Sequence, residues 1–204
     1  TREWQFLGDL QPRMLNFLEN HDEQRAASDF FAGDASRTFA ALSVSLLFNT
    51  APFMLYFGQE FGERGMESEG FSGADGRTSI FDYCIVPSVK RFLDGRLSAS
   101  EKRTRRKYCE LLKTATGEPA FAVGGTYDLM YVNPASDSFN PATTFVWLRG
   151  CEGKVFLVAA NFSGLPADVS VNVPVAAYDY FSISQGPSSV SLTIPPYGCS
   201  IQPL

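Results

Sequence analysis

Met14-Leu15-Asn16-Phe17-Leu18-Glu19-Asn20-His21-Asp22 is the stretch that decides the fold. Its first five residues form a short apolar run, which is typical of a parallel strand buried on both faces. The run ends in a polar cluster at 19–23 that contains the only histidine of the chain. In layers of alternating strands and helices, functional groups lie just past the C-terminal ends of strands. The stretch therefore predicts a parallel strand at 14–18 with a candidate site at its end.

Strand and helix patterns alternate on both sides of this run. Residues 4–10 have the pattern of a helix end, stopped by Pro12. Further on, Asp34 or Ser36 can cap a helix that runs through 40–48. These signals place a helix before and a helix after the predicted strand.

A second strand and a third helix follow. Residues 53–57 form another apolar run, and a glycine-rich loop extends from Gly58 to about Gly76. Ser98 and Glu101 have the spacing of a capping box. The apolar face of the helix that they open consists of Tyr108, Leu111, Leu112 and Ala115. The order strand, helix, strand, helix predicts a parallel α/β layer over residues 1–116.

The pattern of residue types changes after Gly117. Short β-branched runs, several of them alternating, are separated by Gly, Pro, Asn and Asp at 145–148, 155–159, 169–173 and 190–194. No helical pattern is evident there. Residues 117–204 therefore predict a second domain, a small antiparallel β-sandwich.

Composition narrows the classes of function. The chain has 204 residues, of which 45% are hydrophobic, and a net charge of −5. This charge disfavours nucleic acid as a partner, and the charge run at 102–107 is interpreted as the solvated face of a helix. No apolar stretch is long enough to predict a membrane span, no signal peptide opens the chain, and one histidine excludes a histidine-built metal site. The four cysteines are widely spaced, which favours free buried thiols over a disulfide framework.

From spacing alone, the strand-end cluster is equally well interpreted as a structural salt bridge or as a functional group. Four ordered motifs, however, resemble the α-amylase superfamily (glycoside hydrolase family 13). They are FLENHD at 17–22, APFMLYFGQE at 51–60, GRTSIFDY at 76–83 and NFS at 161–163. The resemblance implies the C-terminal quarter of a TIM (β/α)8 barrel, from the end of helix six to helix eight, followed by the antiparallel β-sandwich. It implies no cofactor and no metal.

The resemblance also implies roles for individual residues. Asp22 matches the family's third carboxylate, which binds the sugar next to the scissile bond and stabilises an oxocarbenium-like transition state. His21 matches the histidine that binds the same sugar. Arg25, Glu19 and Gln59 match cleft-lining, substrate-binding positions. Glu60 is interpreted as structural, because it follows the last strand and would pin its loop.

The family's nucleophile and general acid follow the fourth and fifth strands, and the sequence begins after them. We therefore expect a fragment of a retaining hydrolase of starch or maltooligosaccharides, which needs the missing N-terminal part of the barrel as its partner and is inactive alone. One alternative is a non-catalytic carbohydrate-binding module, for which Tyr178, Tyr180 and Phe181 could form an aromatic platform. Another is an amylase-like scaffold without catalysis, against which the His21-Asp22 pair argues.

Overall fold

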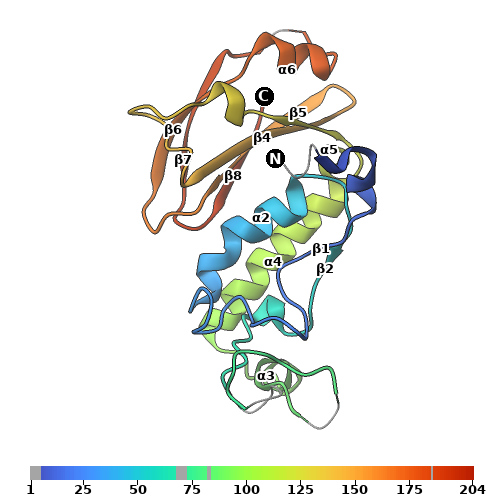
Figure 1. Ribbon diagram of the computed structural model, residues 1–204, viewed down its shortest axis with the longest axis vertical. Helices are drawn as coiled ribbons and strands as arrows, with labels where there is room; N and C mark the ends of the chain where they lie inside the picture. Colours follow the sequence, from blue (N-terminus) through green and yellow to red (C-terminus); the bar gives the residue numbers. More distant parts are fainter. Residues whose placement is uncertain (1–5, 68–72, 82–83, 185) are drawn as a thin grey trace.

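The computed structural model describes residues 6–67, 73–81, 84–184 and 186–204. Figure 1 shows a four-stranded antiparallel sheet between two other layers. A two-stranded sheet covers one of its faces, and the helices α2 and α4 lie against the other. The first half of the chain forms the helical layer and the loops beyond it, and the second half forms the sheets.

The first half alternates short strands with helices, as predicted. Its elements are η1 (Gly8–Arg13), β1 (Asn16–Phe17), η2 (Ala35–Thr38), α2 (Phe39–Leu47), β2 (Phe53–Met54), η3 (Gln59–Phe61), α3 (Pro87–Leu93) and α4 (Ala99–Gly117). β1 and β2 pair in parallel, which confirms the predicted direction of the two strands. Asp34 is the N-cap of η2, which runs directly into α2, and its side chain accepts from the Ser36 N–H. The N-cap of α2 itself, Thr38, makes no capping hydrogen bond with its side chain, so the predicted cap acts one short helix earlier. The predicted Ser98–Glu101 capping box is present.

Three expectations for this half are corrected. Pro12 lies inside η1 instead of ending a helix before it, and residues 1–5 of that predicted helix lie outside the described residues. Helix α3 was not predicted. The strand at 14–18 is not buried on both faces, because Met14, Leu15 and Phe17 are 43%, 51% and 42% exposed. Among the described residues, β1 has one strand neighbour, and α2 lies on one side of it, where the Asn16 side chain donates to the Ser45 carbonyl. No described segment covers the other side, so the apolar side chains there remain exposed to solvent.

The second half consists of two antiparallel sheets. The larger has the order β3 (Gly125–Asp128), β4 (Thr144–Cys151), β5 (Lys154–Asn161) and β8 (Cys199–Pro203), and the smaller pairs β6 (Ala167–Asn172) with β7 (Ser189–Ile194). β4 and β5 form a hairpin whose turn residues, Glu152 and Gly153, both have positive φ, as a tight primed turn requires. β3 and β8 were not predicted.

The expectation that no helix follows Gly117 is wrong. Two short helices, α5 (Pro119–Ala122) and α6 (Val175–Tyr180), lie in this half. Both are too short to show a hydrophobic period, which is why the pattern missed them. A proline begins α5 and another precedes α6, and this is the one start signal that the sequence offered.

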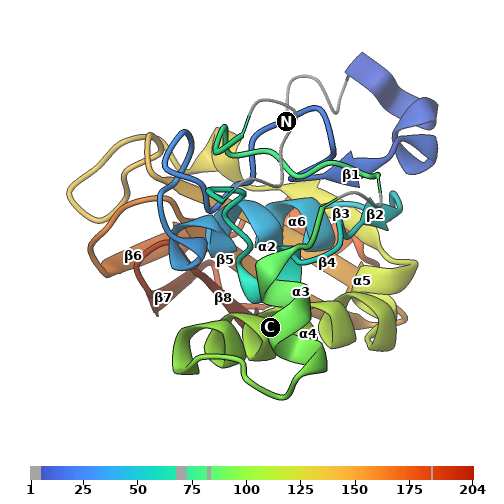
Figure 2. The same ribbon diagram turned by 90° about the horizontal axis from the view of Figure 1, so that it is seen from below.

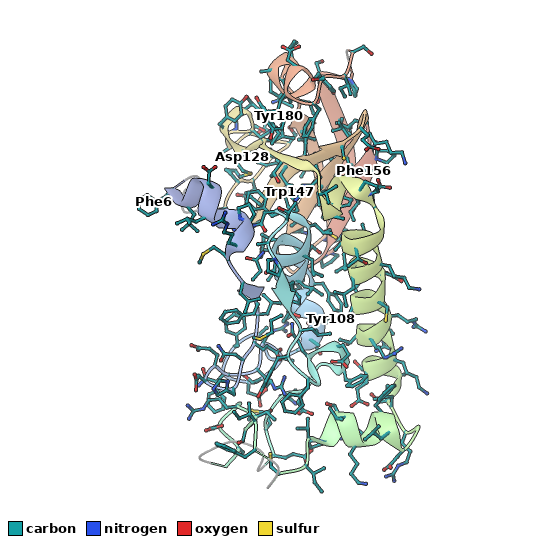
Figure 3. All side chains as sticks on the ribbon, turned by 90° about the vertical axis from the view of Figure 1, so that its right-hand side faces the viewer. Phe6, Tyr108, Asp128, Trp147, Phe156 and Tyr180 are labelled. Atoms are coloured by element: carbon teal, nitrogen blue, oxygen red, sulfur yellow. The ribbon has the colours of Figure 1, made fainter. Side chains whose placement is uncertain are left out.

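Two buried cores lie on opposite faces of the large sheet. One, between the two sheets, includes Val146, Leu157 and Val171. The other joins the sheet to the helices through Trp147, Leu47 and residues of α4. Figure 3 shows Trp147 in the sheet above α2 and Tyr108, a residue of α4, lower down.

Main-chain carbonyls at the end of α2 fix the two halves to each other. The Leu47 carbonyl accepts from Trp147 Nε1 at 3.2 Å and from Arg149 Nη1 at 3.4 Å, and the Phe48 carbonyl accepts from Thr126 Oγ1 at 2.7 Å. Arg149 is fully buried and also donates to three carbonyls around α5. Burial lowers the pKa of Arg149 to about 10. The sheet side chains thus satisfy acceptors that a helix C-terminus leaves free.

Cys84, Cys109, Cys151 and Cys199 are free, as predicted, but only Cys199 of the four is buried. In the described part of the chain, no helix combines the length and the apolar character that crossing a membrane requires.

Candidate active site at the ends of the parallel strands

The loops that follow β1 and β2 lie together because the two strands are parallel neighbours. Seen from below in Figure 2, the segment leading into β1 lies at one edge of the molecule and α4 at the opposite edge. The loop after β1 carries Glu19, His21, Asp22 and Arg25, and the loop after β2 carries Gln59, Glu60 and Glu63. The structure therefore brings the two predicted strand ends to one side of the pair.

His21 and Asp22 form the exposed part of this cluster. His21 Nε2 lies 3.6 Å from Asp22 Oδ1, and the two side chains are 42% and 73% exposed. Asn20 shapes the turn, since its Oδ1 accepts from the N–H of Asp22 at 2.8 Å and of Glu23 at 2.9 Å. No separate role was expected for Asn20, although an Asn whose side chain accepts from the N–H two residues later, an Asx turn, is a recognisable local signal. The pair is held at its backbone and open at its side chains.

Behind the exposed pair lies a buried ion pair. Arg25 is 0% exposed and Glu19 is 2% exposed, with Arg25 Nη1 2.8 Å from Glu19 Oε2. The other oxygen, Oε1, accepts from the Ala26 N–H at 3.1 Å. Burial raises the pKa of Glu19, while Arg25 and the Ala26 hydrogen bond act in the opposite direction. The structural interpretation of the strand-end cluster, a buried salt bridge, is therefore correct for these two residues.

Arg25 also joins three segments of chain. Its Nε donates to Thr78 Oγ1 at 2.9 Å, and its Nη2 donates to the Phe57 carbonyl at 2.8 Å. The guanidinium lies 4.4 Å from the centre of the Tyr56 ring, and Tyr56 donates its own hydroxyl to the Thr78 carbonyl. Thr78 belongs to the motif at 76–83, of which residues 82–83 lie outside the described residues. Arg25 thus locks the loop after β1 to the end of β2 and to the segment around Thr78. The ion-pair partner of Arg25 is Glu19 and that of Asp22 is His21, so Arg25 is not paired with Asp22, beside which it was expected.

Gln59 connects the end of β2 with α4. It is 1% exposed, its Oε1 accepts from the Tyr56 N–H at 3.2 Å, and its Nε2 donates to the Tyr108 hydroxyl at 3.1 Å. Burial raises the pKa of Tyr108, so this phenol stays protonated as an acceptor for Gln59. Gln59 therefore lies in the buried layer, with Glu19 and Arg25.

Glu63, and not Glu60, pins the loop after β2. Its Oε2 accepts from the N–H and the hydroxyl of Ser88, at 3.0 Å and 2.5 Å, and its Oε1 accepts from the N–H groups of Arg64 and Gly65. Burial alone would raise the pKa of Glu63, but these hydrogen bonds lower it below its usual value. Glu60 has a buried Oε2 with no partner in the described residues. The pinning role that the sequence suggested for Glu60 is thus performed three residues later.

The geometry separates two chemical roles. Glu19 and Glu63 are saturated by protein donors, so they build the loops. Asp22 and His21 present a carboxylate and an imidazole to solvent, so they can accept from and donate to the hydroxyls of a bound molecule. Among the described residues, no group of three or more His, Cys, Asp and Glu side chains could hold a metal ion.

Comparisons with known proteins agree on the fold. No protein-family model matches the sequence, and no curated protein matches it significantly. Among solved structures, a debranching enzyme of Nostoc punctiforme soaked with acarbose matches 92% of this chain with a TM-score of 0.57 and 18% identity. AmyP in complex with maltose matches 99% of it (TM-score 0.63, 15% identity), and an α-amylase from H. orenii matches 93% (TM-score 0.56, 19% identity).

The chain therefore has the fold of a C-terminal portion of α-amylases and related enzymes. It covers only 33%, 43% and 39% of the lengths of the three structures named above. The part that it matches consists here of the mixed helical layer and the antiparallel sheets, without a closed barrel in the described residues.

Proposed function

We propose that the chain is the C-terminal part of a retaining glycoside hydrolase that acts on α-glucans such as starch and maltooligosaccharides. In this proposal residues 1–116 supply the last strands and helices of a (β/α)8 barrel, and residues 117–204 form its C-terminal β-sandwich domain. The observation that carries it is the exposed His21-Asp22 pair, held by Asn20 at the end of a parallel strand pair. Two solved structures of AmyP, one in complex with maltose and one of a variant in complex with maltotriose, share this fold and support the choice of ligand.

Asp22 accepts hydrogen bonds from the hydroxyls of the sugar beside the scissile bond. Its bonds strengthen as positive charge develops on the ring, which stabilises the transition state more than the ground state. His21 binds the same sugar through its imidazole. Glu19, Arg25 and Gln59, which the resemblance placed among the substrate-binding residues, are buried in this chain. In this proposal they hold the loops that carry the exposed pair and do not touch the sugar themselves.

A retaining glycosidase also needs two carboxyl groups about 5–5.5 Å apart as nucleophile and acid/base. In this proposal both come from the N-terminal part of the barrel, which pairs with the open strands. The exposed side chains of Met14, Leu15 and Phe17 support such a partner, because apolar strand residues gain from being covered.

Asp22→Asn in the complete enzyme tests the role. The variant is expected to lower kcat by about 100-fold or more and to change KM little, since the lost interaction forms mainly in the transition state. Asp29→Asn is the matched control, because Asp29 is an exposed loop aspartate paired with Arg64, and it should leave kcat unchanged. An unchanged kcat in Asp22→Asn would refute the assignment and favour an amylase-like scaffold.

The isolated chain provides a second test. Incubated with a chromogenic maltooligosaccharide, it should release no product above background, because the nucleophile and the general acid are absent from it. Turnover that disappears in Asp22→Ala would show that the site is complete without a partner, and the proposed division of the barrel would be wrong.

A further inference from the structure

Three tyrosines from three different elements meet on the surface of the second half. Tyr127 lies in β3, Tyr131 in η4 (Met130–Val132) and Tyr180 at the end of α6. Tyr131 and Tyr180 are 64% and 55% exposed. The hydroxyls of Tyr127 and Tyr131 share a hydrogen bond of 2.7 Å, and the rings of Tyr127 and Tyr180 have centroids 5.5 Å apart. We call Tyr127, Tyr131 and Tyr180 the tyrosine surface.

The tyrosine surface is far from the strand-end site. Figure 3 shows Tyr180 at the end of the molecule that carries the sheets, while Tyr108, whose hydroxyl binds Gln59 of the strand-end loops, lies well below it. Figure 1 likewise shows α6 and α3 at opposite ends of the long axis. A molecule bound to the tyrosine surface would therefore not compete directly with one at His21 and Asp22.

Two glycines leave room for the rings of Tyr180 and Phe181 against the large sheet. Gly125 and Gly150 are cross-strand partners in β3 and β4. A Cβ on Gly125 would lie 3.0 Å from the Tyr180 hydroxyl, and a Cβ on Gly150 would lie 2.5 Å from the Phe181 ring. The rings of Tyr180 and Phe181 therefore pack directly on the sheet backbone. They also pack edge to face against each other, with ring centroids 4.8 Å apart. Binding to a ring that is already fixed costs little side-chain entropy.

The chemistry of the tyrosine surface suits a neutral polyhydroxyl ligand. Each ring offers an apolar face, against which the C–H face of a sugar can pack, and a hydroxyl that donates and accepts. Burial and the hydrogen bond that Tyr127 shares with Tyr131 raise the pKa of Tyr127 to about 12, so the Tyr127 phenol is uncharged at neutral pH. An anionic ligand would find no cationic partner in these three side chains.

We propose that Tyr127, Tyr131 and Tyr180 form a second carbohydrate-binding surface, which holds an α-glucan chain by ring packing and phenol hydrogen bonds. That the sugar is an α-glucan rests on the proposed function, whereas the surface itself rests on the geometry of the three tyrosines. Such a surface would keep a polymeric substrate attached while the strand-end site engages another part of it.

Affinity electrophoresis of the whole chain tests the proposal, with soluble starch in one gel and xylan in another. Tyr180→Ala is expected to weaken retardation by starch at least 5-fold and Tyr131→Ala to weaken it as well, while Tyr180→Phe, which keeps the ring, retains most of it. Phe162→Ala, which removes an exposed aromatic ring elsewhere in this half, is the matched control and should bind normally. Thermal melts establish that each variant is folded.

The outcomes separate this proposal from the proposed function. His21→Ala/Asp22→Asn that is retarded like the unmodified chain supports a separate surface. Tyr180-dependent retardation in xylan and not in starch would support the tyrosine surface and contradict the α-glucan function. Equal retardation of the unmodified chain, Tyr180→Ala and Tyr131→Ala, or no retardation of the unmodified chain in either gel, would overturn the tyrosine surface.

Discussion

The parallel pair β1–β2 and the antiparallel pair β4–β5 show how differently the two halves are completed. Each strand of β4–β5 has eight residues, every one of which is paired with the other strand, and Val146, Leu148 and Leu157 are fully buried. β1 and β2 have two residues each. Apolar side chains beside them stay 37–51% exposed, namely Met14, Leu15, Phe17, Leu55 and Phe57.

The difference lies in the neighbours and not in the apolar content of the strands. β4 and β5 have a strand on each side and a core on each face. Within the described residues, β1 and β2 have only each other as strand neighbours, and α2 lies against one side of the pair. A two-stranded unit is marginal in water, so its stability must come from the loops and helices around it. The buried side chains at the strand ends supply that support, because they tie the loops to one another and to α4.

Hydrogen exchange should show the largest contrast between the two pairs. In a monomeric chain, the amides of β1 and β2 are expected to exchange on the order of a hundredfold or more faster than those of β5, because fewer neighbours must separate to expose them. Sedimentation of the same sample establishes the monomer, since self-association would cover the open strands. Equal protection in a strict monomer would show that β1 and β2 need no further partner.

Arg25→Met tests how far a buried ion pair supports the open half. The change leaves the Glu19 carboxylate buried without its cation, which should lower the free energy of unfolding by about 3–5 kcal/mol. Arg64→Met is the matched control, because its ion pair with Asp29 is half exposed and should contribute about 1 kcal/mol or less. Urea unfolding of both variants measures the difference. Similar losses of unfolding free energy in the two variants would mean that the buried Arg25–Glu19 pair contributes no more to stability than an exposed pair.

The comparison also shows what the sequence could predict. Apolar runs, β-branched alternation and caps predicted the parallel direction of β1 and β2, the helices α2 and α4 and the antiparallel second half. They did not predict β3, β8, α5 and α6, which are short or carry a mixed pattern of burial. The exposure of residues 14–17 was not predicted for another reason. An apolar run indicates that a segment prefers to be buried, but it does not indicate whether a neighbouring segment is present to cover it.

For the candidate site, the sequence indicated which loops meet better than it indicated the contacts within them. It predicted that the polar residues after β1 and β2 come together. It did not distinguish the buried Glu19 and Arg25 from the exposed His21 and Asp22, because all lie within seven residues and no periodicity applies in a loop. The pinning role of Glu63 depends on Ser88, which is 25 residues away along the chain, so no local motif could show it.

Glu63→Gln should lower the free energy of unfolding by less than Arg25→Met does, and the loss should depend on pH. The pKa of Glu63 is lowered in the folded chain, so its contribution is present above its ordinary value of 4.5 and is lost as pH falls through the lower folded value. At neutral pH the variant should lose about 2 kcal/mol, because Gln is uncharged and replaces one acceptor by a donor. The difference in free energy of unfolding between the two proteins should shrink as the pH falls below 4.5 and through the lowered pKa of Glu63. A loss that is constant with pH would mean that the carboxylate charge is not what binds Ser88.

Ser98→Ala should have the smallest effect on the free energy of unfolding. It should destabilise both halves together, because α4 packs against α2 and the large sheet. Ser98 Oγ accepts from the Glu101 N–H at 3.2 Å, and the reciprocal bond from the Ser98 N–H to Glu101 Oε2, at 2.7 Å, does not need the hydroxyl. Loss of this one cap should cost about 1 kcal/mol. Ser100→Ala, two positions later on the exposed first turn, should cost nothing or slightly stabilise, since alanine is the better helix former. Because both helices share one core with the sheet, the Ser98→Ala loss should appear in thermal melts as a lower midpoint for the whole molecule. If the melting midpoint is unchanged and hydrogen exchange is faster only for amides in the first turn of α4, the two halves unfold independently.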